Sequence, residues 1–131
     1  MQKVCRKCAE KLAICAISVL LLCSGIAHAV DDVFIEGLPD VPQLEMVTAI
    51  EGEPVIFDTP SGTVAEFTLI LSAAPEEAAR AYDAALTGLG WACVAEPALL
   101  TCAREENRLV FTKPEEGAAD HRIILRLEPV E

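Results

Sequence analysis

The sequence predicts an α+β fold, with one helix packed on one face of an antiparallel sheet of about five to six strands, a two-layer sandwich. Three observations lead to this prediction. Apolar and polar residues alternate along several short runs, as they do in strands with one buried face. A single stretch, 75–89, has the apolar spacing of an amphipathic helix. Turn-forming residues separate the runs closely enough for neighbouring strands to pair antiparallel.

The first 29 residues of the 131-residue chain predict a secretory signal peptide. Four basic residues precede the apolar run Leu12–Cys23, and Ala27-His28-Ala29 places small residues at the two positions that signal peptidase reads. We therefore expect cleavage between Ala29 and Val30, and a protein that is exported to the periplasm or secreted.

Two other uses of this segment are left open. Leu12–Ala29 could act as an uncleaved anchor, although its 18 residues fall short of the ~20 apolar residues that cross a bilayer. Cys23 could carry a lipid, although the residue before a lipidated cysteine is normally small and Leu22 is bulky. Either alternative would leave the protein tethered to a membrane. Cleavage after Ala29 would leave no stable membrane span.

Removing the signal peptide changes the charge of the chain. The full sequence has 10 Lys and Arg and 21 Asp and Glu, of which four basic residues and one acid lie in the first 29 positions. The remaining chain, Val30–Glu131, therefore has six basic and 20 acidic side chains and a formal net charge of −14. Such a chain repels phosphate backbones and anionic lipid surfaces, so nucleic acid is not expected as a partner.

The mature chain divides into an arm and a domain. Residues 30–53 are rich in acids, proline and glycine, and their apolar residues have no period, which predicts an acidic N-terminal arm. From 54 the pattern sharpens into an α+β domain, 54–131. Its first strands are predicted at Val55–Asp58 and Thr63–Leu71, joined by a turn over 59–62. One face of the second strand is apolar: Ala65, Phe67, Leu69 and Leu71.

The helix is predicted over Pro75–Leu89. Pro75 lies in the first turn, where its missing N–H costs no hydrogen bond, and two acids follow it near the positive end of the helix dipole. Gly90 is the expected left-handed cap, which lets Trp91 fold back on Leu86. The apolar stripe consists of Ala78, Tyr82, Ala85, Leu86 and Leu89. Further strands are predicted at Trp91–Ala95, Leu99–Arg104, Arg108–Lys113 and Arg122–Glu128.

The two cysteines outside the signal peptide, Cys93 and Cys102, are predicted to form a structural disulfide. If residues 96–99 make a four-residue turn, the two cysteines lie directly opposite each other on adjacent strands, with β-carbons about 4.5–5.5 Å apart. Export would place them in an oxidising compartment. A redox-active pair is the alternative, but these cysteines lack the close spacing and the helix-terminus setting that lower a thiol pKa.

The hairpin Phe57-Asp-Thr-Pro-Ser-Gly62, the helix ending in Leu89-Gly90-Trp91 and the hairpins after it resemble a family of small exported bacterial proteins with no assigned activity. The resemblance covers roughly residues 38–129 and rests on short turns and caps. It implies the same α+β fold and a location in the cell envelope. It brings no catalytic residues with it.

Four of the six basic side chains of the mature chain lie in the predicted strands near its end: Arg104, Arg108, Arg122 and Arg126. By alternation, most of them would point away from the helix. They could form a guanidinium patch that binds a carboxylate- or phosphate-bearing partner. They could also form a solvent-facing ladder paired with Glu66 and Glu128 across the strands. The ladder is the simpler interpretation, and the patch is kept as a candidate partner-binding surface.

Common catalytic and metal-binding patterns are missing from the sequence. Asp58, Ser61 and His121 supply the residue types of a hydrolytic triad, but nothing in the sequence brings them together. There is no calcium loop of the Asp-x-Asp-x-Asp-Gly type and no glycine-rich phosphate loop. No catalytic residue, metal ligand or cofactor-binding residue is assigned, and no cofactor is expected.

Three functions are compatible with the sequence. The preferred one is a non-catalytic exported binding or accessory domain, whose partner is a protein, a peptide or a small ligand, and whose sheet edges could accept an added strand. The second is an inhibitor or regulator of a periplasmic enzyme that presents the stiff turn Thr59–Gly62. The third and least favoured is a small hydrolase.

Overall fold

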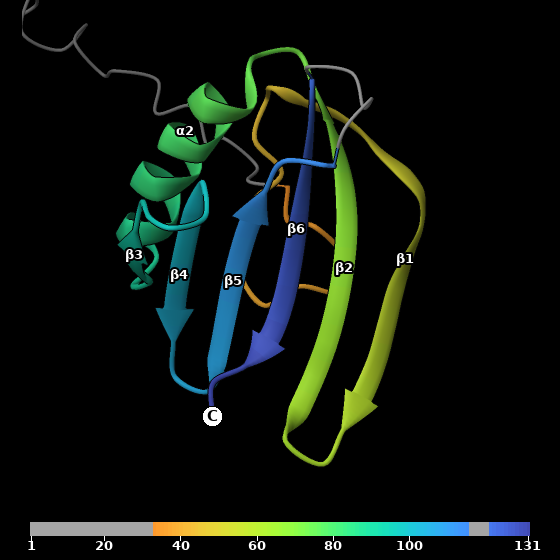
Figure 1. The fold of residues 1–131 in the computed structure, drawn as a ribbon, viewed down its shortest axis with the longest axis vertical. Helices are drawn as coiled ribbons and strands as arrows, with labels where there is room; N and C mark the ends of the chain where they lie inside the picture. The colour runs from red at the N-terminus through yellow and green to blue at the C-terminus, as the bar shows by residue number, and fades with distance from the viewer. Residues whose placement is uncertain (1–32, 116–120) are drawn as a thin grey trace, which may run out of the picture. The chain divides into compact units, whose positions relative to one another are not determined.

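In the part of the chain that the structure describes, six strands pair into one antiparallel sheet in the order β1-β2-β6-β5-β4-β3, and one helix, α2, lies between β2 and β3 (Figure 1). The computed structural model describes residues 33–115 and 121–131, and the predicted signal peptide, its cleavage site and Cys23 lie outside them. The elements are β1 (Val47–Thr59), β2 (Gly62–Leu71), α2 (Pro75–Gly88), β3 (Ala92–Val94), β4 (Leu100–Arg104), β5 (Asn107–Thr112) and β6 (Arg122–Pro129).

One helix with an antiparallel sheet confirms the predicted α+β class, although strands make up most of the fold. Within the described ranges, no helix is long and apolar enough to cross a membrane. The last strand, β6, lies in the middle of the sheet, between β2 and β5. Its alternating Ile123, Leu125 and Leu127 are buried, as the period-two pattern predicts.

Strand β1 begins at Val47, earlier than the sequence pattern predicts. Its pairing with β2 is irregular between Val47 and Ala49 and again between Glu51 and Val55, where Gly52 has a φ of 69°. Such irregularities break the alternation of apolar and polar residues, which is the signal from which a strand is predicted. The last seven residues of the predicted arm, 47–53, therefore belong to the sheet.

Residues 33–46 of the arm pack on the same side of the sheet as the helix. Ile35, Leu38 and Val41 are buried in the hydrophobic core. The hydroxyl of Tyr82 in α2 donates a hydrogen bond to the carbonyl oxygen of Pro42 over 2.9 Å. Because this segment is irregular, its buried apolar residues have no period in the sequence.

Helix α2 ends as its sequence predicts. Gly90 has a φ of 89°, and its N–H donates to the carbonyl of Thr87, while the N–H of Trp91 donates to the carbonyl of Leu86. These two bonds define a Schellman cap. Tyr82 packs against the sheet, with its ring centroid 5.0 Å from that of Phe111. One stripe residue was predicted wrongly: Leu89 is the C-cap and is 40 % exposed, because the chain turns away from the core there.

The predicted disulfide between Cys93 and Cys102 is confirmed. The two residues are direct partners in the pairing of β3 with β4, with their Cα atoms 4.0 Å apart. Cys102 is fully buried among the core residues. The bond therefore attaches the short edge strand β3 to the core.

Candidate binding surface on the β1–β2 hairpin

The hairpin formed by β1 and β2 is held rigidly near its turn. Register pairs run without interruption from Val55↔Glu66 to Thr59↔Gly62. The hydroxyl of Thr63 donates to a carboxylate oxygen of Asp58 over 2.8 Å, and that of Thr59 donates to the carbonyl of Gly62 over 2.8 Å. Strand β2 pairs with β6 only from Ala65 to Ile70, so the turn end of the hairpin extends past this pairing (Figure 1).

Three consecutive large apolar residues on β1, which we call the apolar trio, are exposed on this hairpin. Val55, Ile56 and Phe57 are 60 %, 47 % and 52 % exposed. The other exposed large apolar side chains of the described residues are scattered. Val33, Phe34 and Val130 lie near the ends of the described ranges, Leu89 lies at the end of α2, and Val94 lies on β3. Single exposed apolar residues are common on protein surfaces, whereas neighbouring ones are typical of an interaction site.

The trio borders both faces of the sheet. Ile56 pairs with the buried Ala65 and so lies on the helix side, whereas Val55 and Phe57 pair with Glu66 and Val64 on the opposite side. We call this opposite side the open face, because neither α2 nor residues 33–46 of the arm cover it. The trio also lies on an edge strand, since β1 pairs only with β2. An edge strand has unpaired backbone N–H and C=O groups that can accept a further strand.

The open face is hollowed beside the trio. Val55, Phe57 and Val64 form the apolar wall of a hollow of about 340 Å³, and Glu66, Arg126 and Glu128 complete it. A second hollow of about 480 Å³ shares those three charged residues and continues over β6 and β5, where it is lined by Val110 and Ile124 among others.

Three of the predicted arginines lie on this open face, and each forms an ion pair there. Arg126 pairs with Glu66 at 2.8 Å, Arg108 with Glu128 at 2.7 Å, and Arg122 with Glu51 at 2.9 Å. Hydrogen bonding to Glu66 and its negative charge raise the pKa of Arg126. These guanidinium groups are therefore engaged with carboxylates of the same chain.

Arg104 lies apart from the other three arginines. Its position in β4 has the same parity as the buried Leu100 and Cys102, so its side chain leaves the sheet on the helix side. There it donates to the carbonyl of Leu89 over 3.0 Å and pairs with Asp40 at 2.8 Å. Its guanidinium carbon lies 4.7 Å from the centroid of the Trp91 ring. Arg104 thus connects the arm, the end of α2 and the sheet, and the four arginines do not form one cluster.

The residues that resemble a hydrolytic triad are also separated. Asp58 pairs with Thr63 near the turn of the hairpin, whereas the carbonyl of His121 accepts a hydrogen bond from the N–H of Leu71 at the other end of β2. Leu71 is the eighth residue after Thr63 along β2, which corresponds to about 26 Å. His121 contacts the carbonyl of Ala73 at 3.2 Å through its Nδ1.

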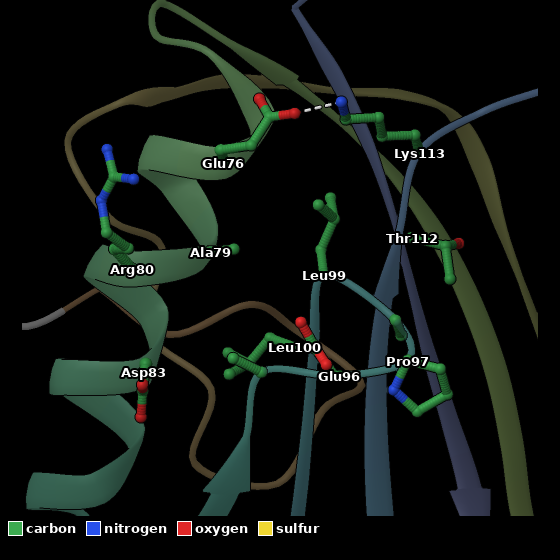
Figure 2. A pocket seen from close by; sticks show the side chains of 12 residues that line it. Glu76, Ala79, Arg80, Asp83, Glu96, Pro97, Leu99, Leu100, Thr112 and Lys113 are labelled. Atoms are coloured by element: carbon green, nitrogen blue, oxygen red, sulfur yellow. Dashed lines mark ion pairs between the residues drawn. The ribbon is translucent and has the colours of Figure 1, made fainter.

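A further hollow, of about 600 Å³, lies between α2 and the loop that joins β3 to β4 (Figure 2). Glu76, at the start of the helix, forms an ion pair with Lys113, and Figure 2 shows Leu99 below that pair. The hydrogen bond from Lys113 lowers the pKa of the Glu76 carboxyl. Glu76 is therefore an ion-pairing carboxylate rather than a group prepared to donate a proton near neutral pH.

Within residues 33–115 and 121–131, no group of three or more His, Cys, Asp or Glu side chains is placed to hold a metal ion. Comparison of the chain with protein-family models, curated proteins and solved structures finds no match. The resemblance to small exported bacterial proteins therefore stays a prediction.

The apolar trio was not among the site residues predicted from the sequence. Val55-Ile-Phe57 has the composition of a buried strand, but it lies on the part of the edge strand β1 near the turn of the hairpin, where its side chains stay about half exposed. One signal in the sequence was available. The run lies directly beside the proline of Glu53-Pro54, and proline is tolerated in a sheet chiefly on edge strands.

Proposed function

We propose that this protein is an exported, non-catalytic binding domain that uses the apolar trio and the free edge of β1 to bind a segment of another protein. The observation that carries the proposal is the exposure of Val55, Ile56 and Phe57 together on one edge strand. Alternating side chains of an added strand would meet Val55 and Phe57 on one face and Ile56 on the other.

The energetics favour such a partner. Full burial of a large apolar side chain contributes about 1.5–3 kcal/mol. All three trio residues are about half exposed in the isolated chain, so each can gain further burial when a partner binds. The rigid hairpin lowers the entropic cost of binding, because the edge is already extended and in register.

Export is part of the proposal. The predicted signal peptide would carry the domain to an oxidising compartment, and the Cys93–Cys102 disulfide is chemically suited to that setting. Cleavage after Ala29 would release the domain, whereas retention of the segment or lipidation of Cys23 would tether it. The mass of the protein isolated from the cell envelope distinguishes these three outcomes.

A second candidate function uses the same hairpin. The bonds of Thr63 to Asp58 and of Thr59 to Gly62 stiffen the turn, which favours presentation of this turn to the cleft of an enzyme as an inhibitor or regulator. A panel of periplasmic proteases tests it: we expect inhibition at micromolar concentrations that is lost when residues 59–62 are replaced by a flexible glycine–serine turn.

Site-specific photocrosslinking tests the binding function. A benzoylphenylalanine is placed at Val55 or, as a matched control, at Val94 on the opposite edge strand, since both valines are 60 % exposed. After irradiation of cells that express the full chain, we expect a discrete adduct with another protein from position 55 and none from position 94. Equal labelling from both positions, or none from position 55, would refute the proposal.

A further inference from the structure

The charge of the hairpin is unbalanced. No lysine, arginine or histidine occurs between Val47 and Leu71, whereas Glu51, Glu53, Asp58 and Glu66 do. Arginines of β6 neutralise two of these acids: Arg122 pairs with Glu51, and Arg126 pairs with Glu66. Among the described residues, Glu53 and Asp58 have no such cationic partner.

These two carboxylates flank the apolar trio. Glu53 precedes it by one proline, and Asp58 follows it directly, so the order along the free edge is acid, proline, three apolar residues, acid. Asp58 is the fifth residue after Glu53, which corresponds to about 17 Å of extended strand. Asp58 accepts a hydrogen bond from the Thr63 hydroxyl, which orients its carboxylate without neutralising it.

The rest of the surface has the same sign. The described ranges contain sixteen acidic and six basic side chains, and five of the basic ones lie in ion pairs with five different acids. Eleven acids and one arginine, Arg80, are left outside these pairs. A partner with the opposite charge therefore meets favourable potential as it approaches the hairpin, and a negatively charged one is repelled.

We infer that the partner segment is cationic: an extended stretch of about six residues with a lysine or arginine at each end and mainly apolar residues between them, added to β1 as a new strand. This inference rests on the proposed function and specifies the chemistry of its partner. The apolar centre of the segment covers the trio, and its two cations lie opposite Glu53 and Asp58. A second copy of this chain does not fit this description, because its own hairpin carries the same uncompensated acids.

Peptide binding to the exported chain, purified from cells that express the full sequence, tests the inference. The probe is a labelled, capped peptide with the core Lys-Ile-Val-Thr-Val-Lys, and matched peptides replace both lysines with glutamine or with glutamate. Because two exposed ion pairs are at stake, we expect the lysine peptide to bind about fivefold more tightly than the glutamine peptide. The glutamate peptide should bind most weakly, and added salt should reduce these differences.

Two double variants locate the effect. In the first, Glu53→Gln with Asp58→Asn, the preference for lysine over glutamine should fall below about twofold. In the second, Glu77→Gln with Glu106→Gln, the same net charge is removed elsewhere and the preference should persist. A Phe57→Ser variant should weaken all three peptides. Thermal unfolding of each variant verifies that it is folded.

The outcomes separate this inference from the proposed function. If the lysine and glutamine peptides bind equally and both lose affinity in Phe57→Ser, the hairpin binds strands but the cationic partner is refuted. A preference that persists in the Glu53 and Asp58 variant also refutes it. Sedimentation that shows a dimer of the wild type and a monomer of Phe57→Ser would replace the cationic segment by a second copy. If no peptide binds and position 55 yields no photoadduct, both proposals fail.

Discussion

Raising the pH should destabilise the fold through a single side chain. Tyr82 is fully buried, and burial raises its pKa to about 12 from an ordinary value of 10.0, opposed in part by the backbone at Leu44. Its hydroxyl donates a hydrogen bond to Pro42, which a phenolate cannot do. Folding therefore favours the neutral form of Tyr82 over the phenolate more strongly than the unfolded chain does.

The magnitude follows from the two pKa values. The stabilisation from neutral Tyr82 is complete below about pH 10, the pKa in the unfolded chain, and is lost as the pH rises through about 12, the pKa in the folded protein. A shift of about 2 units corresponds to about 2.7 kcal/mol in total. Between about pH 9 and about pH 11, the free energy of unfolding should fall by about 1.3 kcal/mol from this group.

Two measurements verify this expectation. The chain has one tyrosine, so phenolate absorbance in the near-ultraviolet reports Tyr82 alone. Urea unfolding at about pH 9 and about pH 11, for the wild type and for Tyr82→Phe, gives the change in the free energy of unfolding. The variant should lose about 1 kcal/mol near neutral pH, because the Pro42 carbonyl is left without its donor, and most of the alkaline decrease should disappear. A phenolate that titrates near 10 in the folded protein, or an equal decrease in both proteins, would refute the reasoning.

Three further predictions concern stability, each measured by urea unfolding. Gly90→Ala should lower the free energy of unfolding by about 1–2 kcal/mol, because Gly90 has a φ of 89°. Gly88→Ala in α2 should raise it by about 0.5–1 kcal/mol, because the added methyl group meets open space there. Equal effects of the two substitutions would contradict the glycine cap. Reduction of the Cys93–Cys102 disulfide should lower the free energy of unfolding by about 2.6 kcal/mol on the chain-entropy model. An unchanged free energy of unfolding after addition of reductant would argue against the disulfide. Arg104→Ala should cost about 1–2 kcal/mol through its stacking and its bond to the helix end, far more than removal of any open-face arginine.

Local patterns in the sequence were sufficient for much of the fold. The period of two in β2 and β6 identified their buried faces, because alternation along a strand does not depend on its neighbours. The glycine after α2 predicted the Schellman cap, since a left-handed residue ends a helix by itself. The number of residues between Cys93 and Cys102 predicted their register, because a short turn fixes which residues face each other.

Arg104 shows where local pattern was insufficient. From alternation, most of the four arginines were expected to point away from the helix, and a common patch was kept only as an alternative to an ion-paired ladder. The parity of β4 places Arg104 on the helix side, where it meets Asp40 and Trp91. The irregular pairing between Glu51 and Val55 likewise hid the first half of β1. The contacts of Arg104 and the irregular pairing of β1 both involve residues that are far apart in the chain, so a short stretch of sequence does not reveal them.

The sequence by itself determined the α+β class, the helix and its cap, the disulfide, and the acidic character of the hairpin. Only the tertiary structure decided that β1 is an edge strand and that Val55, Ile56 and Phe57 are exposed on it. The physical reason is that a run of apolar residues specifies burial only if other parts of the chain cover it. The described part of the chain leaves this run on the edge strand about half exposed.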